Sequence, residues 1–85
     1  MKAGELRAMI DERPFRPLRL HMSEGDPVDI TRPRGVLVAQ RMVVVALDMD
    51  ERGIAGRTTW FDPRHVVKVE RVEQPESENG RRESE

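Results

Sequence analysis

The chain contains no cysteine. No disulfide can therefore stabilise it, and no metal site built from thiolates can form. Long apolar segments are missing too: the longest apolar run, Met42–Leu47, is far shorter than the roughly 20 residues of a membrane-spanning helix. Residues 1–14 carry scattered charges and no apolar stretch typical of a signal peptide. Because a lack of cysteine also fits a reducing compartment, we expect a cytoplasmic protein without membrane contact.

A strong excess of charge of either sign is missing as well. Lysine and arginine together number 15, and aspartate and glutamate number 16. Residues 1–72 are faintly basic and residues 73–85 are acidic, but neither excess is typical of a nucleic-acid-binding domain. Most basic residues are arginine, which suits phosphate and carboxylate groups. GC-rich codon usage also favours arginine, so this excess alone identifies no partner.

A chain of 85 residues is long enough for one small domain. It buries only about 60% of the surface that the unfolded chain exposes, and its core contributes roughly 3–5 kcal/mol of net stability. We expect a single domain in residues 1–73. Residues 74–85 combine many charges with almost no apolar side chain, which predicts a disordered acidic tail.

Residues 3–13 predict a short helix. Leu6, Met9 and Ile10 lie at helical spacing and form a narrow apolar stripe. Pro14 ends the helix, because the residue before a proline is pushed out of the α region.

A hairpin is predicted directly after the helix. Residues 18–22 and 27–31 alternate apolar and polar side chains, which is the period of strands that are buried on one face. Pro17 can begin the first strand because that position needs no ladder donor. Gly25 lies in the turn between the strands, where it can adopt a positive φ. These features predict two antiparallel strands.

The rest of the chain predicts further strands. Residues 36–39 form either a third strand or a short helical turn. Residues 42–47 are β-branched and almost continuously apolar, so we expect a central strand that is covered on both faces. Residues 57–61 resume the strand pattern. Residues 65–72 form the last strand, with Val67, Val69 and Val72 on its buried side and a bulge near Arg71.

One helix followed by about five short strands excludes a layered parallel α/β fold. Short strands with few core residues favour a sheet that closes on itself. We therefore predict a mainly β fold: a small five-stranded barrel of the Src-homology-3-like or Sm-like type. The short N-terminal helix would cap one open end of this barrel, and the C-terminal tail would be disordered.

Several motifs follow one another in a recognisable order. Residues 14–25 match the pattern P-F-x-P-[FL]-x-[IL]-x-[LM]-x-x-G, and residues 65–70 match H-[IV]-x-x-[IV]-E. Between them lie the turn at Pro33 and the valine-rich run Val43–Val45. This order resembles a family of short, functionally uncharacterised bacterial proteins, and the resemblance implies no activity. The predicted topology is also similar to that of Sm-like barrels, but the sequence has no uridine-pocket motif from which an RNA contact could be carried over.

No cluster in the sequence predicts catalysis. His21 and His65 are the only histidines, and a metal site would need a third ligand near both, such as Asp29. Asp48 and Asp50 lack the remaining ligands of a calcium loop. No serine lies in a nucleophile elbow, and no glycine-rich phosphate loop is present. We expect no enzyme, no metal and no cofactor.

The arginines and one tryptophan are the candidate binding residues. Six arginines fall on predicted strands, in turns and at hairpin ends: Arg19, Arg32, Arg34, Arg41, Arg57 and Arg64. Gathered on one face they would bind anions or RNA; otherwise they are solvated and paired with nearby acids. Trp60 and Phe61 are neighbours in a strand, so they must point to opposite faces. One belongs to the core, and the other, if exposed, marks an interaction site.

These observations favour a protein-interaction or assembly module. A small sheet leaves an edge open, and an open edge invites the addition of a strand. The partner would be a second copy of the chain, giving a homo-oligomer, or another protein. The alternative is an Sm-like RNA-binding module that uses an arginine-rich face, which the salt dependence of RNA affinity would reveal.

Overall fold

The computed structural model describes residues 1–72 and contains one helix, six strands and two short 3-10 turns. The elements in chain order are α1 (Ala3–Ile10), β1 (Leu18–Met22), β2 (Val28–Ile30), η1 (Pro33–Gly35), β3 (Val36–Val38), β4 (Val43–Met49), β5 (Ala55–Phe61), η2 (Pro63–His65) and β6 (Val66–Arg71). No helix of this described part is long and apolar enough to cross a membrane. The tail predicted to be disordered, residues 74–85, lies outside the described residues.

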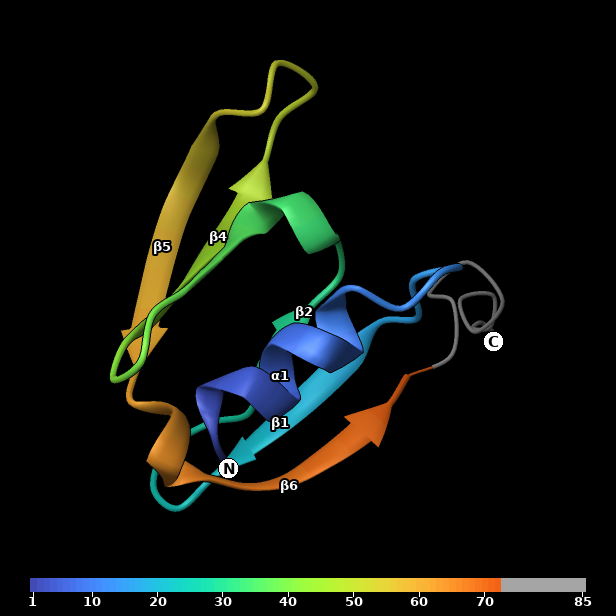
Figure 1. The fold of residues 1–85 in the computed structure, drawn as a ribbon. Helices are drawn as coiled ribbons and strands as arrows, with labels where there is room; N and C mark the ends of the chain where they lie inside the picture. Colours follow the sequence, from blue (N-terminus) through green and yellow to red (C-terminus); the bar gives the residue numbers. More distant parts are fainter. Residues whose placement is uncertain (73–85) are drawn as a thin grey trace, which may run out of the picture.

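The first sheet has the strand order β2-β1-β6 (Figure 1). β1 and β2 form the predicted antiparallel hairpin, with Leu18 opposite Ile30 and Leu20 opposite Val28. Gly25 lies in the turn with a φ of 87°, a conformation that glycine adopts without strain. β6 pairs with the other side of β1, so the first and last strands of the described residues lie side by side in one sheet.

The second sheet has the strand order β3-β4-β5, and the valine-rich segment is its central strand, as predicted. Val43 and Val45 are 0% and 2% exposed, whereas Val44 between them is only half-buried. The prediction that this strand is covered on both faces is therefore wrong. The burial of β4 alternates as in a sheet with one buried face, although Val44, which points outward, is also apolar.

The predicted five-stranded barrel of the Src-homology-3-like or Sm-like type is wrong. Residues 36–38 supply a sixth strand, and no ladder within residues 1–72 joins one sheet to the other. Both crossings between the sheets pass through a 3-10 turn that begins with a proline, η1 after β2 and η2 after β5. Proline has a fixed φ and donates no ladder hydrogen bond, so strand pairing is interrupted at each crossing. The chain forms two sheets with open edges.

The core lies between the two sheets and beneath α1 (Figure 1). All layers contribute to it, through Leu6, Ile10, Leu18, Leu20, Ile30, Val43, Val45, Phe61 and Val66. Leu6 and Ile10 are fully buried and Met9 packs against them at the margin, which confirms the apolar stripe predicted for the helix. α1 therefore closes one side of a core that the two small sheets leave open.

β6 departs from simple alternation at one residue. Met22 of β1 pairs with Val66 and His21 pairs with Lys68, so the register shifts between them. Val67 is the extra residue of this β-bulge, and it is 65% exposed. The predicted inward position of Val67 is wrong, because the bulge turns Val66 into the core instead. The predicted bulge near Arg71 is wrong too, since Arg71 pairs in regular register with Leu18.

The location of the core can be tested by making an alanine substitution at two strand positions. Leu20 is 0% exposed and Val67 is 65% exposed. We expect Leu20→Ala to lower the free energy of unfolding by about 2–5 kcal/mol, because it leaves a cavity. Val67→Ala should change it by no more than about 0.5 kcal/mol. Urea denaturation followed by circular dichroism measures both, and equal losses would contradict this core.

Candidate functional site

An apolar row crosses the outer face of the second sheet. The register places Leu37 of β3 opposite Val44 of β4, and Val44 opposite Trp60 of β5. Leu37 is 67% exposed and Trp60 is 68% exposed, so the row faces solvent. Contiguous exposed apolar side chains often mark interaction sites. We call this row the Trp60 face.

Strand alternation explains why the tryptophan lies outside. Phe61 is 7% exposed, belongs to the core and stands opposite Val43 in the ladder. Successive side chains of a strand point to opposite faces, so Trp60 points outward. The two neighbouring aromatic residues thus divide between the core and the Trp60 face.

The Trp60 face ends at an open strand edge. β5 is the last strand of its sheet, and no other strand of residues 1–72 pairs with its outer side. Figure 1 shows β5 at the margin of the fold. Gly56, Arg57 and Thr58 of this strand are exposed together with Trp60. An edge of this kind presents unpaired backbone N–H and C=O groups to another strand.

Two grooves of opposite charge border β5. The acidic groove, of about 650 Å³, lies at the carboxyl end of β5 next to Trp60, and its lining includes Glu24, Asp26, Asp62 and His65, of which Asp62 is paired with Arg64. The basic groove, of about 570 Å³, runs over the Trp60 face toward the β4–β5 turn, and its charged lining consists of Arg34 and Arg52. The surface along β5 therefore carries charges of opposite sign at its two ends.

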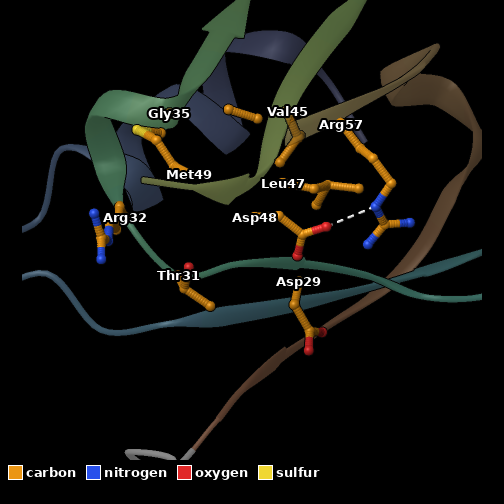
Figure 2. Close-up of a pocket in the computed structure, with 10 residues that line it drawn as sticks. Asp29, Thr31, Arg32, Gly35, Val45, Leu47, Asp48, Met49 and Arg57 are labelled. Carbon is orange, nitrogen blue, oxygen red and sulfur yellow. Dashed lines mark hydrogen bonds and ion pairs between the residues drawn. The ribbon is translucent and has the colours of Figure 1, made fainter. Parts of the chain in front are cut away.

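A smaller pocket, of about 280 Å³, opens between the end of β2 and the far ends of β4 and β5 (Figure 2). Leu47 and Arg57, which are ladder partners, line it together with Asp48. Asp48 has a positive φ of 54°, which aspartate adopts more readily than most residues. Its Oδ2 accepts a hydrogen bond of 2.7 Å from the Arg57 Nε, and this bond lowers the pKa of the Asp48 carboxyl. Asp48 therefore stays ionised and paired with Arg57.

The six arginines singled out in the sequence lie in different places. Three form ion pairs with neighbouring aspartates: Arg19–Asp29, Arg57–Asp48 and Arg64–Asp62. The other three make no ion pair within residues 1–72, and each lines a different hollow: Arg32 the pocket of Figure 2, Arg34 the basic groove, and Arg41 a hollow beside the start of α1. Arg32 and Arg57 share one of these hollows, and Arg41 and Arg64 share another. In the described part of the chain, none of these four hollows is lined by all six arginines.

The two histidines have separate surroundings. The His21 Nε2 lies 2.8 Å from the Glu70 Oε1, and this hydrogen bond lowers the pKa of the Glu70 carboxyl. His65 is exposed in η2, and its carbonyl oxygen accepts a hydrogen bond from the Ser23 N–H at 2.8 Å. Asp29, the third ligand considered, pairs with an arginine instead. Residues 1–72 contain no group of three or more side chains that could hold a metal ion.

Comparison of the chain with protein-family models, curated proteins and solved structures finds no match. The resemblance of residues 14–25 and 65–70 to a bacterial family therefore stays a prediction. The function of this chain is therefore inferred from the surface just described. Sequence reasoning named Trp60 but missed Leu37, Val44 and the acidic groove, because these depend on strand register.

The pKa of Asp62 provides a test of the local structure at the acidic groove. The Arg64 side chain and backbone N–H both donate to its carboxylate, at 2.7 and 2.8 Å, which lowers the pKa to about 2. Because this pKa lies below the ordinary value of 3.8, the ionised Asp62 carboxylate contributes its full stabilisation of the fold at pH values above 3.8. The contribution is lost as the pH falls from about 4 toward 2. Carboxyl NMR titration should show the low midpoint, and Arg64→Gln should raise it; an unchanged midpoint in the variant would contradict the ion pair.

Proposed function

We propose that this protein is an interaction and assembly module without a catalytic role, and that it binds a protein partner through the Trp60 face and the open edge of β5. Trp60 carries this proposal. The chain has a single tryptophan, and that residue is 68% exposed at the end of an apolar row beside an unpaired strand edge. Tryptophan is enriched among the residues that dominate binding energy at protein interfaces.

The edge and the apolar row supply complementary parts of one binding surface. A strand added to β5 would gain main-chain hydrogen bonds, and side-chain contacts with the row would give specificity. Burying a large apolar side chain contributes about 1.5–3 kcal/mol. For a domain whose own core contributes roughly 3–5 kcal/mol, association through this surface would add substantially to stability.

The charge of the chain supports self-association as well as binding to another protein. The formal net charge is −1, so two copies would not repel one another strongly. We expect a homo-oligomer in the cytoplasm, the location that the lack of cysteine predicts, with another protein as the second kind of partner.

RNA binding through the arginines is the alternative, and it draws less support. Three of the six arginines are neutralised by aspartates, and the others line separate hollows. Phosphate binding would need several of them on one track. A labelled oligouridine titrated at low and at physiological salt tests this function. Affinity that falls steeply with salt would favour RNA binding over assembly.

The assembly proposal predicts that Trp60→Ser separates the copies. Each copy would lose about 1.5–3 kcal/mol of apolar burial, so a symmetric dimer should weaken by roughly a hundredfold or more in dissociation constant. Light scattering across a concentration series up to tens of micromolar measures the mass. The matched control is Val67→Ser, which removes an equally exposed apolar side chain (65%) from the other sheet and should leave the mass unchanged. A monomeric wild-type chain throughout the series would contradict self-association.

A further inference from the structure

We infer that the partner on the Trp60 face is a second copy of this chain, and that the two copies pair antiparallel along β5, with the basic groove of each against the acidic groove of the other. This inference rests on the proposed function, and it adds the partner, its orientation and the residues that fix the orientation. Three observations carry it: the open edge, the positions of Trp60 and Gly56, and the opposite charges of the two grooves.

The residues of β5 are arranged to pair with themselves. β5 spans Ala55–Phe61, so Thr58 is its midpoint. A twofold axis through Thr58 sets Trp60 of one copy opposite Gly56 of the other, in the self-complementary manner of a twofold interface. An aromatic side chain that lies across a strand glycine covers backbone that the glycine leaves bare. Gly56 is exposed, and a Cβ atom there would come within 3.3 Å of Asp48, so β4 also favours glycine at this position.

Antiparallel pairing also matches the charges. The basic groove lies toward the amino end of β5 and carries Arg34 and Arg52, whereas the acidic groove lies at the carboxyl end. In an antiparallel pair each basic end meets an acidic end, twice per dimer. The Arg52 side chain is 75% exposed although it pairs with Asp50 at 3.3 Å. Arg34 in the basic groove, and Glu24 and Asp26 in the acidic groove, take part in none of the ion pairs formed within residues 1–72. Parallel pairing would instead set like charges against each other, which disfavours that orientation.

Such a pair would join the two second sheets into one. The strand order would run β3-β4-β5 and then β5-β4-β3 of the second copy, with both open β5 edges satisfied. The apolar row of each copy, in which Leu37, Val44 and Trp60 lie on one line of register, would end against Gly56 of the other copy. Each copy thus contributes its tryptophan to a surface that is incomplete in the monomer.

The absence of cysteine makes disulfide trapping a direct test of the axis. In Thr58→Cys the only thiol lies at the midpoint of β5. Directly opposed strand residues have Cα atoms about 4.5–5.5 Å apart, which suits a disulfide. Mild oxidation at tens of micromolar should therefore convert this variant almost completely to a covalent dimer. Val67→Cys is the control: it is equally exposed but lies on β6, and it should remain largely monomeric on a denaturing gel.

Charge reversal tests the orientation independently. Arg52→Glu and Asp26→Arg should each weaken self-association by about tenfold or more, because each variant sets like charges together at both ends of the dimer. An equimolar mixture of the two variants should restore it, since both contacts then pair opposite charges again. Lys68→Glu reverses an exposed charge on β6 and should change nothing. Sedimentation equilibrium measures all four samples against the wild type.

The outcomes separate this inference from the proposed function. Suppose the wild type self-associates and Trp60→Ser abolishes it, but Thr58→Cys fails to cross-link or the mixture fails to recover. The Trp60 face would then still be the interface, and the antiparallel β5 pair would be overturned. A chain that stays monomeric throughout the series would overturn the second copy as partner and leave the face to a strand of another protein. Faster trapping of Val67→Cys than of Thr58→Cys would move the interface to β6.

Discussion

The fold depends on one constraint: the two small sheets share a single apolar core, and each sheet can bury only one face in it. The core consists of nine buried apolar side chains drawn from both sheets and from α1. Leu6 and Ile10 of α1 are needed to close it, because the sheets do not wrap around it by themselves. The outer face of each sheet is consequently left to solvent, and the two sheets differ in how that face is composed.

On the first sheet the outer face is polar and internally paired. Arg19 stands opposite Asp29 on one side and Glu70 on the other, and it forms an ion pair with Asp29. His21 reaches Glu70 from the neighbouring position. Surface pairs of this kind contribute only about 0–1 kcal/mol each to stability, but they leave the polar side chains of this face bonded to one another. On the second sheet the equivalent positions are Leu37, Val44 and Trp60. Within residues 1–72, a continuous apolar row therefore crosses the outer face of the second sheet, whereas the first sheet pairs most of its outward side chains by charge.

Sequence patterns predicted the elements better than their assembly. Helical spacing located the stripe of α1, and strand alternation with Gly25 located the β1–β2 hairpin, because these signals are local. The prediction of a closed barrel was wrong because closure requires pairing between strands that are far apart in the sequence. Pro33 and Pro63 interrupt that pairing. Those prolines were visible in the sequence, but a proline at a strand end fits either a tight turn within one sheet or a crossing to another. The local pattern does not separate these two outcomes.

The candidate site was not predicted either, because a local apolar pattern also fits more than one arrangement. A continuous apolar run predicts a strand covered on both faces, so residues 42–47 predicted a buried strand, and Val44 gave no sign of lying at the surface. The strand pattern predicted a bulge near Arg71 but not the bulge that exposes Val67, since that bulge follows from a register shift between His21 and Met22. Trp60 alone could be singled out, because two adjacent aromatic residues in a strand cannot both be buried on one side.

The two wrong predictions, a closed barrel and a central strand covered on both faces, concern the same exposed surface. A closed barrel would have paired the outer side of β5 within the chain, and a strand covered on both faces would have removed Val44 from solvent. Neither occurs in residues 1–72, so the unpaired edge and the uncovered apolar row meet at the same strand. Edge strands in natural proteins are usually protected by charges, prolines or bulges. β6 has such a bulge at Val67 and alternating charges, whereas β5 presents threonine, glycine and tryptophan, with Arg57 as its one charged residue held by Asp48. The β5 edge beside the apolar row therefore lacks these forms of protection, as does the short β3 edge on the other side of the same sheet.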